Sequence, residues 1–299
     1  LGSGDSTVNA SDGDDTISVG FGDHFADLGD GNNIYSFISG SNTTQDGTYA
    51  PVSDPGTNLT IIGGSGNDRI DHDGTWAGYY VTYNITLGEG DNYFNGNAGF
   101  GTSTITAGNG DDEIYLSRGT NDIRLGGGNN LITLQQHNFS GGISNNYIET
   151  GSGNDAITTG DGTDTITAGS GADTINGLSG DKTVVSTGLA GEAVSVVFTD
   201  GLHDISTGAS NDYIVLGSGN STISAGLGDD TIYITNAATL TLTYTGGLDT
   251  VNGTVGALVL DIDPAAIIDF STGYLVATID AANILTVTGI TDIAQVTFI

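Results

Sequence analysis

The sequence contains no cysteine among its 299 residues. This absence excludes a disulfide scaffold, a thiolate metal site and a cysteine nucleophile. Only three prolines occur against fifty glycines, which is typical of a chain with many tight turns at positive φ and not of a proline-rich linker. No hydrophobic run approaches the roughly 18 residues of a membrane helix, so we expect no membrane insertion.

Positive charge is equally scarce. The chain has 4 Lys and Arg residues against 36 Asp and Glu residues, and its formal net charge is −32. A compact body with this charge repels itself unless it binds cations or is disordered. Disordered acidic chains are poor in β-branched and aromatic residues, whereas Ile, Val and Thr recur here at fixed places, so we favour bound cations. The acidity also argues against nucleic acid and anionic membrane surfaces as partners.

A nine-residue period runs through the chain, with the pattern Gly-x-Gly-(Asp/Asn)-(Asp/Asn)-x-(Ile/Val). It is clearest in the units that begin at Gly151, Gly160 and Gly169. The apolar position stays in phase from Val8 to Val251. Because so short a unit cannot bury its apolar residue alone, it must stack on copies of itself.

Each unit predicts a glycine-rich turn followed by a three-residue strand whose central side chain points inward. Two units form one coil of eighteen residues, and stacked coils form two parallel sheets with a thin row of Ile and Val between them. Glycine at this density costs about 1 kcal/mol per residue in a helix relative to Ala, and no helical periodicity is present. The predicted fold is therefore all-β, a parallel β-roll or β-solenoid with two nonapeptides per coil.

The period is interrupted near residues 36–63, 71–107, 133–150 and 185–207. Several interruptions still alternate apolar and polar residues, so we expect wider coils or side hairpins on one solenoid that spans residues 1–235. From residue 236 the glycine pattern fades, and the chain to Ile299 is typical of ordinary strands. Since an open sheet edge must be capped or paired, residues 236–299 are predicted to form a C-terminal β cap or an assembly region.

The second acidic position of each unit, called the slot below, predicts a metal site. Coils stack about 4.8 Å apart, so Asp155 should face Asp173, and Asp212 should face Asp230. Two bare carboxylates at about 5 Å repel by roughly 3 kcal/mol at an effective dielectric near 20. Calcium accepts about six to eight oxygens in flexible geometry, which include turn carbonyls, whereas magnesium prefers a tighter octahedron. Zinc favours His or Cys, and neither belongs to the repeat.

At these residues the sequence resembles the RTX (repeats-in-toxin) family, whose nonapeptide is a calcium-binding β-helix repeat. The resemblance covers most of residues 1–235 and none of the tail. It implies a right-handed parallel β-roll, calcium-dependent folding, and type I export from a Gram-negative bacterium. It also implies side-chain oxygens from the repeat's Asp and carbonyl oxygens from the turns, with Asp68 as a further candidate. We predict several calcium ions, with ligands among Asp14, Asp15, Asp111, Asp112, Asn130, Asp155, Asp164, Asp173, Asp212, Asp229 and Asp230.

Some slots depart from this pattern. They hold Asn33, Asn92, Asn121, Asn130, Ser6, Ser221, His24 and Lys182. Because Lys182 faces Asp164 one coil away, an internal ion pair can replace a calcium ion there. We therefore expect two or three good sites and several degenerate ones, with much of the first half held by Asn ladders and Ile packing.

One interruption contains an aromatic cluster, made of Trp76, Tyr79, Tyr80 and Tyr83 beside His72. We interpret it as a local apolar plug, with an aromatic platform for a sugar as the alternative. The histidines accompany no Ser-His-Asp spacing, and no single pair of carboxylates stands out as a glycosidase pair. We therefore expect that the chain is not an enzyme.

These patterns favour an extracellular calcium-binding structural protein of the bacterial cell surface, such as a surface-layer, filament or matrix subunit. An acidic chain of this kind can stay unfolded at low cytosolic calcium and fold after export, because the free energy of calcium binding becomes folding free energy. Expected partners are further copies of the chain, in a lattice or fibre, and a surface polysaccharide. The alternatives are the repeat module of a secreted enzyme and a carbohydrate-binding or ice-binding adhesin.

Overall fold

The computed structural model describes residues 1, 4–20, 22–37, 57–72, 81–96, 101–117, 119–134 and 144–299. The chain divides into two compact units, Leu1–Tyr147 (unit 1) and Ile148–Ile299 (unit 2). Among the described residues the only helix is the short 3₁₀ segment η1 (Ile293–Gln295), and the other elements are strands, which confirms the predicted all-β fold. None of the described helical structure has the length and apolarity that crossing a bilayer requires.

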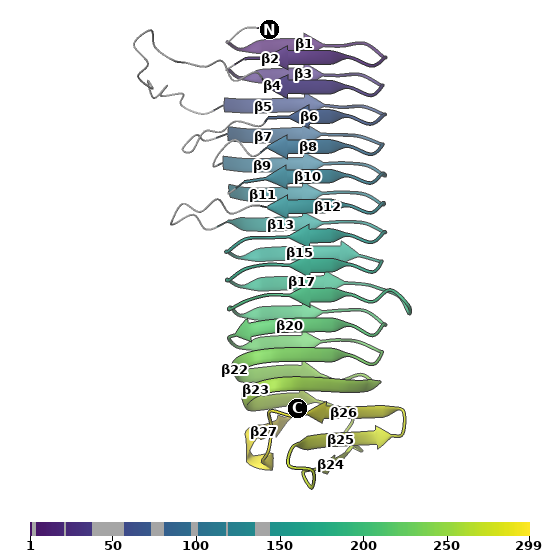
Figure 1. Cartoon of the computed structure of the whole chain (residues 1–299), viewed down its shortest axis with the longest axis vertical. Helices are drawn as coiled ribbons and strands as arrows, with labels where there is room; N and C mark the ends of the chain where they lie inside the picture. Colours follow the sequence, from purple (N-terminus) through teal and green to yellow (C-terminus); the bar gives the residue numbers. More distant parts are fainter. Residues whose placement is uncertain are drawn as a thin grey trace, which may run out of the picture. The chain divides into compact units, whose positions relative to one another are not determined.

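In unit 1 the strands alternate between two faces, and each strand pairs in parallel with the next strand of its own face (Figure 1). Face A contains β1 (Ser6–Asn9), β3 (His24–Asp27), β5 (Thr57–Ile62), β7 (Val81–Thr86), β9 (Gly101–Thr106) and β11 (Gly119–Arg124). Face B contains β2 (Thr16–Val19), β4 (Ile34–Phe37), β6 (Arg69–Asp71), β8 (Tyr93–Gly96), β10 (Glu113–Leu116) and β12 (Leu131–Leu134). The next strand, β13 (Asn145–Glu149), crosses the boundary between the units.

Unit 2 repeats this arrangement. Its face A contains β15 (Asp164–Gly169), β17 (Lys182–Ser186), β19 (His203–Ser206) and β21 (Ser221–Ser224), and its face B contains β14 (Ala156–Thr158), β16 (Thr174–Asn176), β18 (Ser195–Val197) and β20 (Tyr213–Ser218). The long strands β22 (Thr231–Thr243) and β23 (Leu248–Asp261) each serve both faces, because the first part of β22 pairs with β20 and the second part with β21. Parallel pairing therefore continues past residue 235, where loss of the glycine pattern suggested a boundary, and it changes only after Asp261.

The register shows the predicted eighteen-residue step wherever the period is unbroken, as in the pairing of Ala156 with Thr174. Interruptions widen this step without ending the parallel pairing: His24 pairs with Leu59, and Lys182 pairs with His203. The described parts of the interruptions are thus parts of wider coils. In unit 1, residues 38–56, 73–80, 97–100 and 135–143 lie outside the described residues, and each stretch follows a face B strand.

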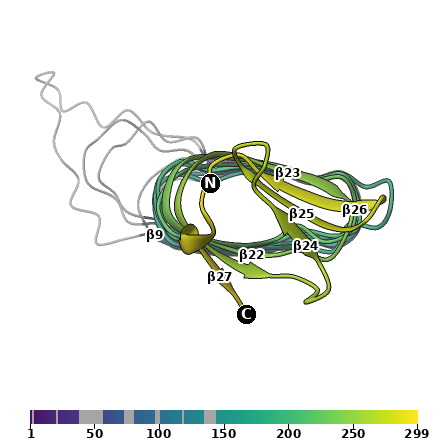
Figure 2. The ribbon, with the colours of Figure 1, turned by 90° about the horizontal axis from the view of Figure 1, so that it is seen from below.

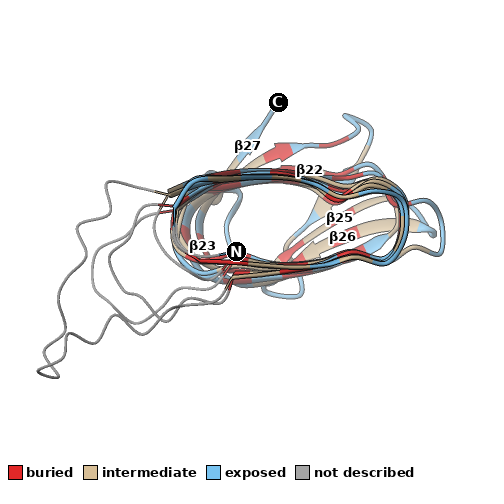
Figure 3. Ribbon diagram, turned by 90° about the horizontal axis from the view of Figure 1, so that it is seen from above, coloured by how far each residue is buried: buried red, intermediate tan, exposed pale blue. Residues whose placement is uncertain are grey.

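The core of each unit is the row of inward side chains between the two faces. Figure 3 shows coils end on, with buried positions along both of their long sides. Ile114, Ile123, Ile166 and Ile175 are all fully buried, as the in-phase apolar position predicted. Glycine is required at the turns: Gly171 has φ +134°, and a Cβ atom there would lie 1.9 Å from the carbonyl oxygen of Gly153 in the preceding coil.

The C-terminal strands cover the last coil of unit 2 (Figure 2). They are β24 (Ile267–Asp269), β25 (Leu275–Asp280), β26 (Asn283–Val287) and β27 (Val296–Phe298). Strands β24, β25 and β26 pair antiparallel, while β26 and β27 pair in parallel with the two halves of β23. Both halves of the last coiled strand are thus hydrogen-bonded to a capping strand.

Candidate metal centre

The slot residues that stand at the start of the face B strands form one file in each unit. The unit 1 file consists of Asp15, Asn33, Asp68, Asn92, Asp112 and Asn130. The unit 2 file consists of Asp155, Asp173, Asp212, Asp230 and Asp249, with Val194 between Asp173 and Asp212. Acid and amide alternate strictly in unit 1, whereas every polar member in unit 2 is an acid.

A ladder of hydrogen bonds holds each file together. The backbone N–H of one slot residue donates to Oδ1 of the slot residue in the next coil. Asp155 donates to Asp173 at 3.0 Å, and Asp212 donates to Asp230 at 2.8 Å. In unit 1 the same bond joins Asn33 to Asp68 at 2.9 Å. The predicted facing of slot residues one coil apart is therefore confirmed, and one carboxylate oxygen of each pair has a fixed role.

The second carboxylate oxygen, Oδ2, has a different environment. It is buried and accepts no hydrogen bond in Asp15, Asp68, Asp112 and Asp230. The last three side chains belong to residues that are at most 1% exposed. A buried charged oxygen without a partner costs several kcal/mol. A stable fold therefore needs a proton or a cation at these oxygens.

The Asn slots show which backbone groups surround the slot side chain. In Asn33 the amide nitrogen Nδ2 donates to the carbonyl oxygens of Gly29 at 3.3 Å and Gly31 at 3.2 Å, four and two residues earlier. Asn92 and Asn130 make the corresponding bonds in their own turns. Two turn carbonyls thus point at each slot, and an amide satisfies them with its own hydrogens. An ionised Asp has no hydrogen to offer.

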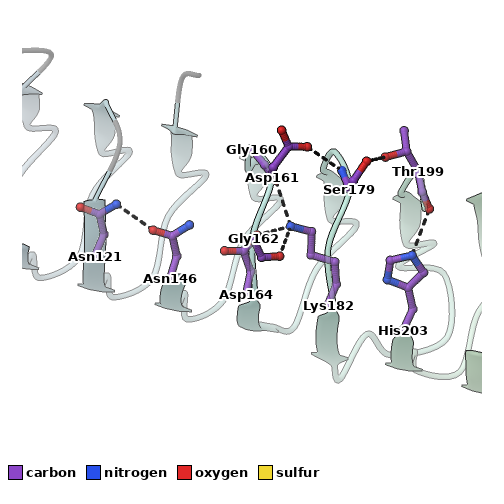
Figure 4. A network of polar contacts seen from close by, with 10 residues as sticks. All are labelled: Asn121, Asn146, Gly160, Asp161, Gly162, Asp164, Ser179, Lys182, Thr199 and His203. Carbon is purple, nitrogen blue, oxygen red and sulfur yellow. Dashed lines mark hydrogen bonds and ion pairs between the residues drawn. The ribbon is translucent and has the colours of Figure 1, made fainter. Parts of the chain in front are cut away.

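Lys182 places an ammonium group in such a site. Its Nζ lies 2.9 Å from the carbonyl oxygens of Gly160 and Gly162 and 2.6 Å from Oδ2 of Asp164, and both charged side chains are fully buried (Figure 4). The predicted ion pair with Asp164 is confirmed. Carbonyls four and two residues before the Asp, together with Oδ2, therefore form a set of oxygens that binds a positive charge.

The buried carboxyls resist ionisation when no cation is present. Burial raises the pKa of Asp112 and Asp173 to about 6, and that of Asp230 and Asp249 to about 7, although a backbone hydrogen bond opposes each rise. Neighbouring carboxylates raise the pKa of Asp230 further, with Asp249 as the largest contributor among them. Burial also raises the pKa of Asp68 and Asp212. A divalent cation reverses this preference, because it stabilises the charged form.

The predicted ligands fall into two groups. Seven of them occupy slots as acids: Asp15, Asp112, Asp155, Asp164, Asp173, Asp212 and Asp230. Asn130 also occupies a slot, but it fills it with its own amide. Asp14, Asp111 and Asp229 stand one residue earlier, are exposed, and accept a backbone N–H of the next coil through Oδ1. The structure thus places these three in an outer ladder and not in the slots.

Slots at the start of the face A strands are filled mainly by donors. Nε2 of His24 lies 2.7 Å from the carbonyl oxygen of Gly20, and Nε2 of His203 lies 3.1 Å from that of Thr199, in each case four residues earlier. Asn121 donates to Asn146 at 2.7 Å. Asp164 is the one acid among the described face A slots of unit 2, and it is paired with Lys182.

Sequence reasoning missed Asp249 as a site residue and treated Asp68 only as a further candidate. Both side chains are buried in the files. The signal for Asp249 was available, because Val251 stands in the apolar phase two residues later, but Thr245 replaces the first glycine of that unit. Trp76, Tyr79 and Tyr80 lie outside the described residues, whereas Tyr83 is buried in the core, 2.5 Å from Nδ1 of His72 through its hydroxyl.

The donor set suits a hard cation. No group of three or more His, Cys, Asp or Glu side chains that could hold a metal ion occurs in the part of the chain that is described. The candidate sites instead join Oδ2 of a slot acid to the turn carbonyls four and two residues before it, which are the oxygens that Lys182 contacts at Asp164. Such all-oxygen sets of irregular geometry are the ligands that calcium takes. The orphaned Oδ2 atoms and the Lys182 ammonium both fit this cation.

Comparison with known proteins agrees with this chemistry. The family model described as RTX calcium-binding nonapeptide repeat (4 copies) matches residues 2–35, 60–74, 99–132, 140–175, 158–181 and 206–233, which together make up about half of the chain. A search of curated proteins and a search of solved structures each gave no match.

Proposed function

Because the chain belongs to the family of RTX calcium-binding nonapeptide repeats, which bind calcium at several sites and are typically found in secreted proteins, we propose that it is a calcium-driven structural protein of the bacterial cell surface. In this role it is a surface-layer, filament or matrix subunit. Calcium outside the cell folds the chain, and the folded chain then assembles with further copies.

One observation carries this proposal: the unit 2 file stacks acids in consecutive coils with a carboxylate oxygen left over. Asp230 is 1% exposed, its Oδ2 accepts no hydrogen bond, and its neighbours in the file are Asp212 and Asp249. Two such carboxylates at coil spacing repel by roughly 3 kcal/mol at an effective dielectric near 20. Calcium binding removes this cost in the folded state alone, so it contributes directly to folding free energy.

The proposal assigns the chain a structural and not a catalytic role. The described histidines support it, since each one has a structural contact. His24 and His203 fill slots, and His72 is buried against Tyr83, with its pKa lowered to about 4 chiefly by burial. A histidine with this pKa is a poor proton acceptor at neutral pH.

The C-terminal strands support assembly. Large apolar side chains are exposed there: Ile267 is 70% exposed, Phe298 is 45% exposed, and Ile299 is 70% exposed. Phe298 and Ile299 are adjacent in the chain, and adjoining exposed apolar side chains favour contact with another protein surface. We assign this surface to a further copy of the chain.

A surface polysaccharide is the second proposed partner. Tyr213 and Tyr233 stand side by side on the outer side of face B, each 44% exposed, with ring centroids 5.8 Å apart. Exposed aromatic faces with nearby polar groups suit sugar rings. Loss of polysaccharide binding in the double variant Tyr213→Ala/Tyr233→Ala, with an unchanged β-sheet spectrum, is the expected result; unchanged binding would contradict this assignment.

The main proposal is tested by far-ultraviolet circular dichroism and sedimentation of the same chain. The chain is first treated with a chelator and then titrated with calcium. We expect a cooperative transition from coil to β structure, followed by growth into oligomers. A folded chain that stays monomeric at saturating calcium would contradict the assembly role and favour the repeat module of a secreted enzyme. A β spectrum that is indifferent to the chelator would contradict calcium-driven folding itself.

A further inference from the structure

The coil that contains Asp249 lies beyond the segments that match the repeat family, the last of which ends at residue 233. The structure nevertheless continues the unit 2 file into this coil. The backbone N–H of Asp230 donates to Oδ1 of Asp249 at 3.0 Å, as in the preceding coils. Asp249 is 5% exposed, and burial raises its pKa to about 7.

The turn before Asp230 has the same glycine spacing as the turn that holds Lys182. Gly226 and Gly228 stand four and two residues before Asp230, as Gly160 and Gly162 stand before Asp164. The next coil packs closely against this turn, because a Cβ atom on Gly247 would lie 1.7 Å from the carbonyl oxygen of Gly228. The hydroxyl of Thr245 donates to the carbonyl of Gly226.

The residue one coil later decides what the oxygen set binds. In the coil after Asp164 this residue is Lys182, whose ammonium supplies the positive charge. In the coil after Asp230 it is Asp249, a second carboxylate. Oδ2 of Asp230 is buried without a hydrogen-bond partner. The two turns thus share their carbonyls and their first acid, but only one of them contains its own cation.

No side chain in this part of the chain supplies that charge. The sequence contains no Lys or Arg after Lys182. Negative charge instead accumulates: Asp249, Asp280, Asp229 and Asp230 all act on Tyr244 and, together with its burial as the largest cause, raise the pKa of that phenol to about 12. The Tyr244 hydroxyl donates to the carbonyl of Gly247 at 2.6 Å and so closes the turn before Asp249. Several buried carboxyls without a basic partner need either a proton or an external cation.

This site would act on the C-terminal strands. Leu248 pairs with Ile284, and Asp249 pairs with Leu285, so β26 lies directly on the strand that contains the second acid. The side chain of Asn283 accepts the backbone N–H of Gly247 at 3.1 Å. A cation that fixes Asp249 therefore fixes the surface on which β26 pairs.

We propose that Asp230 and Asp249, with the carbonyl oxygens of Gly226 and Gly228, form a calcium site that extends past the recognised repeats through Asp249, and that this ion fastens the C-terminal strands to the last coil. The inference rests on the proposed function only in taking calcium as the ion that the files bind. It adds a ligand, Asp249, that lies beyond the family match.

The first test is Asp249→Asn in the full chain. Asn keeps the Oδ1 acceptor for the Asp230 N–H and removes the charge, so the ladder survives. We expect one calcium ion fewer per chain by equilibrium dialysis, and loss of the calcium-induced hydrogen-exchange protection of residues 284–287. The matched control is Asp261→Asn, which removes an exposed carboxylate from the same strand and should leave both readouts unchanged.

The second test is Asp249→Lys, which reproduces the arrangement of Lys182. The new ammonium should take the place of the ion, so that the calcium count again falls by one while residues 284–287 stay protected in chelator. Parental calcium counts in both Asp249 variants would overturn the inference and leave the proposed function intact. A parent chain that binds no calcium would instead contradict the proposed function.

Discussion

The two files solve one electrostatic problem in different ways. In unit 1 every acid of the file has Asn neighbours, and the amides of Asn33, Asn92 and Asn130 satisfy the turn carbonyls with their own hydrogens. In unit 2 the acids Asp212, Asp230 and Asp249 follow one another, and no amide intervenes. An Asn slot thus differs from an Asp slot by one amide nitrogen in place of one carboxylate oxygen. The coil with Asn supplies its own hydrogen-bond donors, whereas the coil with Asp needs a cation.

Lys182 neutralises the buried acid in a third way, with a positive charge from the protein itself. It shows that the slot needs charge compensation as well as hydrogen-bond donors. Its ammonium satisfies two carbonyls and one carboxylate at once. The comparison teaches that the calcium requirement of a turn is set by its own slot residue together with the slot residue one coil later. Variants at these slots should convert individual coils between amide donors, a bound calcium ion and an internal ammonium group.

The largest expected effect follows from removing the internal cation. Lys182→Met keeps the length of the side chain but removes the buried ammonium group that Asp164 and two carbonyl oxygens contact. Breaking one partner of a buried ion pair typically costs about 3–5 kcal/mol. We expect a loss of this size in the free energy of unfolding, measured by urea denaturation in chelator. A loss below about 1 kcal/mol, the range of exposed ion pairs, would show that the pair contributes little.

Lys182→Asp sharpens the same comparison, because it converts the coil into the unit 2 type. The new acid faces Asp164 one coil away, so the variant should be as unstable as Lys182→Met in chelator. Calcium should restore the stability of Lys182→Asp but not that of Lys182→Met. The Asp variant should then bind one more calcium ion per chain than the parent. An unchanged calcium count in the Asp variant would contradict the assigned geometry of the site.

Acid should partly replace calcium, and more so in unit 2. In chelator, the raised folded-state pKa values mean that protonated Asp173 and Asp230 stabilise the fold fully below their ordinary pKa of 3.8. This stabilisation is lost as pH rises through about 6 for Asp173 and about 7 for Asp230. One pKa unit corresponds to about 1.4 kcal/mol, so a few kcal/mol should be lost between pH 4 and pH 8.

Hydrogen exchange measured at a series of pH values can separate the two units in this experiment. The pKa of Asp112 in unit 1 is about 6, whereas those of Asp230 and Asp249 in unit 2 are about 7. Protection in chelator should therefore persist to higher pH in unit 2. With calcium present the sign should reverse, because protons compete with the ion for the same oxygens. Chelator-treated stability that rises with pH would contradict the assignment of these carboxyls.

An intermediate effect is expected when an acid replaces an amide in unit 1. Asn92→Asp creates three consecutive acids with Asp68 and Asp112 and removes the amide that donates to Gly90 and to Oδ1 of Asp112. Leaving buried acceptors unsatisfied costs about 1–3 kcal/mol, so stability in chelator should fall by this amount and return with calcium. Asn84→Asp, at an exposed position of β7 outside the slots, serves as the control for added charge.

Much of this arrangement follows from the period. The in-phase apolar residues, such as Ile114 and Ile175, are buried, and Asp155 faces Asp173 as the eighteen-residue step predicted. The period could not show which slots share a file once an interruption intervenes. Asn33 and Asp68 are neighbours although 35 residues separate them, because a wider coil can absorb any length without changing the register of its strands.

Asp249 was missed for a related physical reason. Strand β22 passes from one face to the other with no glycine between Thr231 and Thr243, so the glycine signal vanishes while the coil continues. The glycine pattern indicates the backbone conformation of the turns, whereas the metal site depends on which side chain stands at the slot after the turn. The sequence favoured the second acid of each turn as the slot residue, but it kept Asp111 beside Asp112 among the candidate ligands, because both match the acidic positions.

The smallest expected effect separates that adjacent pair. Asp111 is exposed, and its Oδ1 accepts the backbone N–H of Asn129 at 2.6 Å, while Asp112 is fully buried in the slot. Asp111→Ala removes one exposed hydrogen bond that water can replace, so stability should fall by less than about 1 kcal/mol and the calcium count should not change. Asp112→Ala should cost more and remove any ion bound at its slot. Equal calcium loss in the two variants would place the outer ladder in the binding site and erase the distinction between the two ladders.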